Sequence, residues 1–276
     1  MARSLRSLFV FSDADVVAPK DYLRQLVPQL AQPGVGCITC LPRGIEAHTL
    51  GDKMIALHYS FNYLPQWMLA QHATGIHWAI GHTMAVPRTV LEKLGGFKNF
   101  LNHLADDYEL GNRVSQLELR VIVPPLLVDC VMPMETFGES FVRMQRWKRT
   151  IRRVRGLQFV GVSLTYPVFW ALVLALLQPF AWWAWALLAT VAIIRWLLTW
   201  GMQQIIKLPS WPCTWWFLPV MDIVEGITCV GAYFGNTILW NGRYYQLKPD
   251  GTIEFASSKC KYNRQHSEES MGFTPQ

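Results

Sequence analysis

The stretch LADDYELG, residues 104–111, and the stretch RMQRW, residues 143–147, lie at the two ends of the segment that organises this chain. Between them, residues 119–125 read LRVIVPP, a β-branched run that predicts a strand. A cluster of arginines and lysines follows residue 147, and most of the remaining sequence is apolar. The acidic end therefore predicts a site in an α/β unit, and the basic end predicts its attachment to a membrane.

The acidic end carries three carboxylates within four positions, at Asp106, Asp107 and Glu109. Acidic residues favour the first turn of a helix because they interact with the positive end of its dipole, so a plain helix start is the simpler interpretation. Three acids exceed what a helix start needs, and crowded carboxylates raise one another's pKa values. A carboxylate with a raised pKa is suited to general base chemistry. The segment thus also predicts a catalytic base.

A second acidic motif, Ser12-Asp13-Ala14-Asp15, follows an apolar run at residues 7–11 that predicts a buried strand. Side chains directly after such a strand lie at the sheet edge where α/β proteins bind ligands. Two carboxylates one residue apart suit Mg²⁺ or Mn²⁺ bridging a diphosphate, because these ions prefer oxygen ligands. The alternative is a simple turn, in which aspartate is common.

Hydrophobic periodicity predicts alternating helices and strands in the first half of the chain. We expect helices at residues 19–32, 52–69, 88–94 and from 106, strands at 35–41, 76–86, 119–123 and 126–131, and a loop at 42–51. Gly81 interrupts one predicted strand, which indicates a close approach of the backbone to a ligand. His72, His77 and His82 have no metal-ligand spacing on one element, and ordinary polar positions are the favoured interpretation.

Residues 137–156 predict a basic amphipathic helix. Its apolar positions, Phe141, Met144, Trp147 and Ile151, fall on one face, while most of the arginines and lysines lie elsewhere. This pattern is typical of a helix that lies on a membrane surface with its aromatic side towards the lipid.

Three apolar runs follow this helix. Residues 158–177 and 180–202 are each long enough to cross a bilayer, which takes about 20 residues, and Pro179 between them predicts a hairpin. Arg195 interrupts the second run and should face protein or the interface. The third run, residues 215–240, contains Asp222 and Glu225. It is expected to span the membrane, re-enter it or lie at its surface.

The composition agrees with a membrane protein. Charged residues make up 16% of the chain, against about 25% in a typical soluble domain. The net charge is +6, but the basic cluster adjoins an apolar run, which fits anionic lipid headgroups better than nucleic acid. Cys37 and Cys40 form a lone C-x-x-C without a second pair, so two strand cysteines in a reduced compartment are favoured over a zinc site.

In their order, these motifs resemble those of the ceramide glucosyltransferase family, lipid glycosyltransferases of the GT-A fold whose relatives include bacterial members and hopanoid glycosyltransferases. The resemblance covers residues 8–250 and rests on Ser12-Asp13-Ala14-Asp15, Gly81-His82-Thr83-Met84, Gly95-Gly96-Phe97, Ala105-Asp106-Asp107-Tyr108 and Arg143-Met144-Gln145-Arg146-Trp147. It implies an α/β fold with a partial GT-A catalytic domain at residues 1–137, followed by C-terminal transmembrane helices. The interfacial helix would occupy residues 138–157, the membrane region 158–240 and a polar tail 241–276.

The resemblance implies a membrane-bound inverting transfer of a hexose, with glucose as first choice, from a UDP-sugar to a lipid hydroxyl, with ceramide as first choice. Asp107 would be the general base, and Asp13 and Asp15 would hold a divalent metal, Mg²⁺ or Mn²⁺, together with the diphosphate. Arg143, Arg146 and Trp147 would bind the departing diphosphate and frame the acceptor pocket. The expected partners are the UDP-sugar, the lipid acceptor and the membrane, without nucleic acid. The catalytic part is expected on the cytoplasmic side of a membrane, the bacterial inner membrane as first choice.

The chain also departs from the family pattern. Family members carry a nucleotide-binding segment and a membrane helix before the Asp-x-Asp strand, whereas this sequence begins almost on that strand. We therefore expect an N-terminally truncated member. The alternatives are a hopanoid N-acetylglucosaminyltransferase and a truncated, non-catalytic relative. A processive polysaccharide synthase fits less well because few apolar runs are present to form a channel, and a small transporter has only the intramembrane Asp222 in its favour.

Overall fold

The computed structural model describes residues 8–100, 102–206, 214–240 and 242–256. Its first sheet has the order β1-β5-β3-β6, and β1 and β3 pair antiparallel with β5 while β3 runs parallel to β6. These strands are β1 (Leu8–Ser12), β5 (Thr83–Pro87), β3 (Val35–Thr39) and β6 (Arg120–Ile122). β1 ends where the sequence predicts, so Asp13 directly follows a strand.

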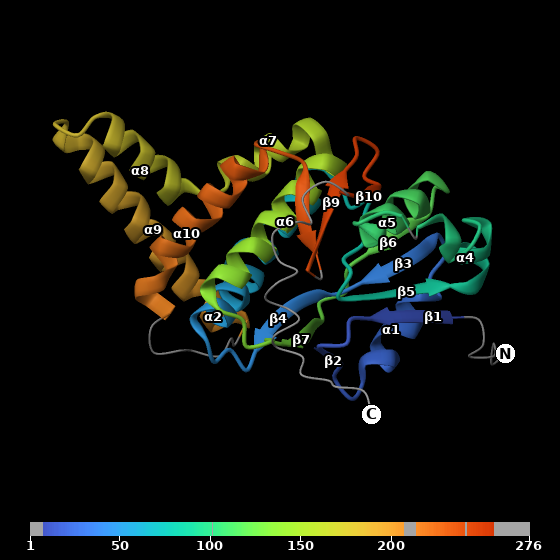
Figure 1. Ribbon diagram of the computed structural model, residues 1–276. Coiled ribbons are helices and arrows are strands. Elements are labelled where there is room, and N and C mark those ends of the chain that lie inside the picture. The colour runs from blue at the N-terminus through green and yellow to red at the C-terminus, as the bar shows by residue number, and fades with distance from the viewer. Residues whose placement is uncertain (1–7, 101, 207–213, 241, 257–276) are drawn as a thin grey trace, which may run out of the picture.

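A second sheet continues the first. It has the order β2-β7-β4, formed by β2 (Val16–Val17), β7 (Leu127–Val131) and β4 (Leu41–Ile45). Only Cys40 separates β3 from β4, so one stretch of chain passes from the first sheet into the second (Figure 1). The expected loop at residues 42–51 is therefore wrong over its first part. Pro42 is tolerated because β4 is an edge strand, and Gly44 is needed because a Cβ there would lie 2.6 Å from the Cα of Ala56.

Helices cover these sheets largely where the periodicity predicts them. α1 (Tyr22–Leu30), α4 (Arg88–Lys93) and α5 (Asp106–Gln116) confirm three of the expected helices, and a 3₁₀ turn, η3 (Phe97–Asn99), follows Gly95 and Gly96. The predicted helix at 52–69 extends further and is divided into α2 (Leu50–Leu57), the π-helix η2 (His58–Tyr63) and α3 (Leu64–Thr74). The strand predicted at 76–86 is confirmed only from Thr83, because residues 76–82 are irregular, and residues 78–82 line a cavity described below.

The basic helix is confirmed as α6 (Phe137–Arg155), which starts with a capping box between Thr136 and Glu139. The expectation that its aromatic side faces lipid is wrong, because that side packs against protein. Met144 is fully buried, and Phe141 and Trp147 pack against the same core cluster, which also contains residues of α2 and of α10 (Thr214–Ala232). The apolar face of α6 thus packs between protein helices.

The apolar region contains one straight helix that is long and apolar enough to cross a membrane, among the residues that the structure describes. This helix is Trp182–Ile205 within α9 (Trp182–Ile206), and only 6% of its most apolar stretch is buried inside the protein. The first predicted span is wrong as a single helix, because η4 (Gly156–Gln158), α7 (Phe159–Leu164) and α8 (Pro167–Leu177) divide it and the helix bends by 67° before Pro167. α8 and α9 form the predicted hairpin, which extends away from the sheets (Figure 1).

After α10 the chain forms a third sheet, in which β8 (Thr237–Trp240), β9 (Arg243–Leu247) and β10 (Ile253–Phe255) follow one another. Two of these strands lie within the stretch expected to be a polar tail, while the tail from Ser257 lies outside the described residues. Arg149 donates to the Thr237 carbonyl at 2.6 Å and Arg152 to the Asn236 side chain at 2.6 Å. Arg149 and Arg152 of the basic cluster therefore bind protein groups.

Candidate active site

One cavity of about 600 Å³ lies between the α/β unit and helices α3, α6 and α7. This size is typical of small-molecule sites. Every site residue expected from the sequence lines it: Asp13, Asp15, Asp107, Arg143, Arg146 and Trp147. Residues more than 130 positions apart in the chain are thereby brought to one site.

Asp13 and Asp15 form one end of the cavity, in the turn between β1 and β2. The backbone N–H of Asp13 donates to the carbonyl of His82 at 3.1 Å, which fixes the turn against the start of β5. Partial burial raises the pKa of Asp13, and the nearby charges of Asp15 and Asp106 raise it further. The acidic groups are therefore close enough to influence one another.

The chemistry of this acidic pair fits a divalent ion only in part. Among the described residues, no group of three or more His, Cys, Asp or Glu side chains is arranged to hold a metal. Two carboxylates nevertheless suffice for Mg²⁺ when substrate phosphates supply further oxygen ligands. Asp13 and Asp15 therefore fit an ion that binds together with a diphosphate, rather than a permanent metal centre.

Asp107 occupies the first turn of α5 and faces the same cavity. One carboxylate oxygen accepts a hydrogen bond from the Tyr108 N–H at 2.7 Å, and the other accepts one from the Gly81 N–H at 2.7 Å. Burial raises the pKa of Asp107 to about 6, and the charges of Asp106 and Asp13 add to this rise. The direction agrees with the sequence argument, although burial rather than charge crowding is the main cause.

Two neighbours of Asp107 differ from expectation. Gly81 approaches this carboxylate, since a Cβ on Gly81 would lie 3.2 Å from Asp107 Oδ2. Glu109, the third acid of the motif, forms an ion pair with Arg113 at 2.6 Å. Asp106 and Asp107, rather than all three acids, therefore make the acidic side of the cavity.

The basic side of the cavity comes from α6. Arg146 and Trp147 follow Arg143 by three and four residues, so both lie one helical turn from it on the same face. Arg143 forms an ion pair with Glu135, and its guanidinium lies 5.9 Å from the centre of the Trp147 ring. Positive charge from this helix and the acidic pair line the same cavity, which suits an anionic ligand held with a cation.

Aromatic residues that the sequence analysis did not single out complete the walls. The Arg155 guanidinium lies 3.7 Å above the Trp78 ring, and Trp78 stacks on Tyr108. The π-helix contributes His58, Tyr59 and Tyr63, because its wider turn places adjacent residues on the cavity side. No periodicity in the sequence distinguishes a π-helix from the flanking α-helices, so this contribution has no sequence signal.

His82 has a more specific place than the ordinary polar position expected from the sequence. Its Nε2 is 3.0 Å from the Tyr59 hydroxyl, and its ring packs edge-on against Tyr59. Burial lowers the pKa of His82 to about 4, so the ring is neutral at physiological pH. The neutral imidazole contributes no charge to the cavity, while the backbone carbonyl of the same residue holds the Asp13 turn.

Part of the cavity wall is apolar. This part includes residues of α3 and α7, among them Leu69, Ala73 and Val162. Gly161 leaves open space on this side, since a Cβ there would meet no atom within 4 Å. The cavity therefore combines charged side chains with an apolar part of its wall that accommodates apolar groups.

Comparison with known proteins agrees with this arrangement. The model of glycosyl transferase family 21 matches residues 1–253, a range that includes every residue lining the cavity. A search of curated proteins finds no match. Because the family match spans most of the chain, the chain belongs to glycosyl transferase family 21 and is a sugar-transferring enzyme.

Proposed function

We propose that the chain transfers a hexose, glucose as first choice, from a UDP-sugar to a lipid hydroxyl with inversion, and that ceramide is the leading acceptor. The observation that carries the proposal is a single cavity in which an acidic pair, a carboxylate with a pKa of about 6 and two arginines converge. Inverting transfer needs these groups: a base on the acceptor side and positive charge at the departing diphosphate.

The donor would bind at the charged side chains of the cavity. Asp13 and Asp15 are the residues that would hold Mg²⁺ or Mn²⁺, which when bound supplies positive charge to the diphosphate. Arg146 and Arg143 in the wall of the same cavity would supply further positive charge. Together they would stabilise the negative charge that develops on the leaving diphosphate.

Asp107 would act on the acceptor. The lipid hydroxyl oxygen attacks the anomeric carbon of the sugar while the bond from that carbon to the diphosphate oxygen breaks. The hydroxyl proton passes to Asp107, and the nucleoside diphosphate leaves. A pKa of about 6 keeps Asp107 mostly ionised at neutral pH while leaving it more basic than an ordinary aspartate.

The lipid acceptor and a membrane location are supported by the apolar parts of the molecule. α9 is long enough to span a bilayer, and most of its large apolar side chains are exposed. Exposed apolar surface on this scale marks an interaction site. The apolar part of the cavity wall suits the hydrocarbon next to an acceptor hydroxyl.

The test is a transfer assay with radiolabelled UDP-glucose and ceramide on membranes that contain the chain. We expect a labelled lipid product, its loss in Asp107→Ala, and its retention in the control Glu92→Gln, which changes only an exposed ion pair with Arg88. Label that persists in Asp107→Ala would remove this residue as the base. A product only with UDP-N-acetylglucosamine or a hopanoid would replace glucose or ceramide, and no product with any donor would overturn the proposal.

A further inference from the structure

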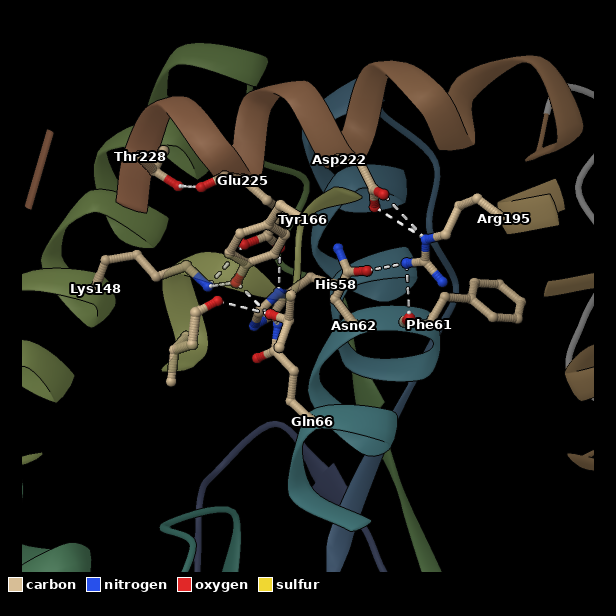
Figure 2. Close-up of polar contacts among 12 residues, drawn as sticks. His58, Phe61, Asn62, Gln66, Lys148, Tyr166, Arg195, Asp222, Glu225 and Thr228 are labelled. Carbon is tan, nitrogen blue, oxygen red and sulfur yellow. Dashed lines mark hydrogen bonds and ion pairs between the residues drawn. The ribbon is translucent and has the colours of Figure 1, made fainter. Parts of the chain in front are cut away.

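A buried polar network joins α10 to the cavity wall, and the proposed reaction does not use it (Figure 2). Its centre is Glu225, which is fully buried. One carboxylate oxygen of Glu225 binds His58 Nδ1, and the other forms an ion pair with Lys148 Nζ at 2.7 Å. Lys148 also donates to the Tyr166 hydroxyl, which accepts from Gln66 as well, at 3.0 Å.

The location of His58 and Lys148 indicates more than a link between helices. Burying charges is costly, and apolar residues of similar size often join helices at least as stably. His58 and Lys148 both line the cavity although they are almost fully buried. The same helix carries a second ion pair, Asp222 with Arg195, of which neither residue lines the cavity. The Glu225 contacts therefore link α10 to the cavity wall, whereas the ion pair of Asp222 with Arg195 links helices without lining the cavity.

Both oxygens of Glu225 act on the surroundings of Trp147. Lys148 is the next residue in α6, so its ion pair fixes the backbone beside Trp147. The His58 ring stacks on the Trp147 ring, with centroids 5.7 Å apart and planes inclined by 26°. One carboxylate thus holds the helix that carries Trp147 and a ring that packs on its face.

The contacts continue from Trp147 to the acidic pair. The Tyr59 ring also stacks on Trp147, at 6.0 Å, and the Tyr59 hydroxyl binds His82 Nε2. The carbonyl of His82 in turn accepts from the backbone N–H of Asp13. A continuous path of packed rings and hydrogen bonds therefore leads from α10 to the turn that carries Asp13.

We propose that Glu225 is a positioning residue for the active site: through His58 and Lys148 it holds Trp147 in the orientation that the bound donor requires. The geometric part stands on the contacts alone, whereas the effect on catalysis rests on the proposed function. Asp222 is the matched control, because it lies on the same helix and its carboxylate receives two 3.1 Å contacts from Arg195.

The geometric part is tested without donor or acceptor. The purified chain is labelled with 5-fluorotryptophan, and the ¹⁹F resonance of Trp147 is identified by its loss in Trp147→Phe. We expect Glu225→Gln to shift this resonance and Asp222→Asn to leave it in place. An unchanged Trp147 resonance in Glu225→Gln would overturn the proposal whether or not the chain transfers a sugar. Should Glu225→Gln fail to fold, Lys148→Gln is the second variant. It removes the ion pair beside Trp147 but leaves His58 bound to Glu225, and we expect the Trp147 resonance to shift here too.

The catalytic part is tested by a double-mutant cycle on kcat/KM for the UDP-sugar. We expect Glu225→Gln to lower kcat/KM about tenfold in the wild-type background but less than about twofold in Trp147→Phe, because residues that act through one another are not additive. Asp222→Asn should change kcat/KM less than about twofold. Equal losses in both backgrounds would mean that Glu225 supports only the fold. Absence of any transfer in the wild-type chain would count against the proposed function and leave the ¹⁹F result to decide the geometry.

Discussion

At the scale of single residues, burial outweighs charge in setting the chemistry of the acidic motif. Burial raises the pKa of both Asp106 and Asp107, and the pKa of Asp107 rises to about 6 although two backbone N–H groups donate to its carboxylate. Hydrogen bonds from N–H groups lower a carboxyl pKa, so withdrawal from water must exceed their effect. The sequence shows where the acidic residues are, and burial in the folded protein gives Asp107 the raised pKa that suits a base.

This pKa predicts the pH dependence of the transfer. A base works only when it is deprotonated, so kcat/KM should fall about tenfold per unit below pH 6 and level off above it. Asp106→Asn removes a charge that raises the pKa of Asp107, so the acidic limb should move to lower pH. Glu109→Gln is the control, because Glu109 is paired with Arg113. If the acidic limb of the kcat/KM profile lies at the same pH in Asp106→Asn and in the wild type, Asp107 is not the group that titrates.

Gly81 tests how exactly Asp107 must be placed. In Gly81→Ala the new Cβ would lie 3.2 Å from Asp107 Oδ2, so the carboxylate must move by a few tenths of an ångström. Small displacements of reacting groups cost up to about 100-fold in rate, and we expect a loss of roughly tenfold in kcat with little change in melting temperature. Gly138→Ala, which meets no atom within 4 Å, is the control. Full activity in Gly81→Ala would show that Asp107 tolerates displacement.

At the scale of elements, close packing rather than helix propensity decides the position of α5. Gly111 lies against the backbone of Trp78 and Ala79, and a Cβ there would come within 2.1 Å of the Ala79 nitrogen. Glycine inside a helix costs about 1 kcal/mol relative to alanine, so the close contact outweighs propensity at this position. This contact fixes the helix that presents Asp107 to the cavity.

Gly111→Ala should therefore destabilise the chain. The gain in helix propensity is about 1 kcal/mol, whereas overpacking costs about 1–3 kcal/mol, and more where backbone atoms must move. We expect a net loss of at least about 1 kcal/mol in the free energy of unfolding, measured by denaturant titration in detergent. An increase in stability for Gly111→Ala, as propensity alone predicts, would contradict this packing.

At the scale of the whole molecule, the helical hairpin of α8 and α9 packs on α10 with one side and leaves many large apolar side chains exposed on the other. Ile194, Leu198 and Ile205 on α9 are each more than half exposed. By contrast, Arg195 on the same helix points inward to Asp222 and the Phe61 carbonyl (Figure 2). One face of α9 thus binds the protein, and the other is suited to lipid.

Charges on the exposed face of α9 should release the chain from membranes. A central charged residue costs about 3 kcal/mol in membrane insertion, so Ile194→Lys combined with Leu198→Lys should move a large fraction of the chain into the soluble fraction after alkaline extraction. Leu23→Lys on α1, an exposed apolar position of the α/β unit, is the control. Retention of the double variant in the membrane pellet would mean that α9 is not the anchor.

The sequence by itself determined the acidic strand end at Asp13, the helix start at Asp107, the basic helix with Trp147 and the apolar helix α9. These features depend on local patterns of charge and periodicity, which act over one element. The tertiary structure decided that α6 packs between protein helices, that the first apolar run breaks before Pro167, and that residues 243–255 join a sheet. It also decided that Glu225 meets His58 and Lys148. Such contacts join residues far apart in the chain, and the physical reason they escape the sequence is that burial exists only once distant elements pack together.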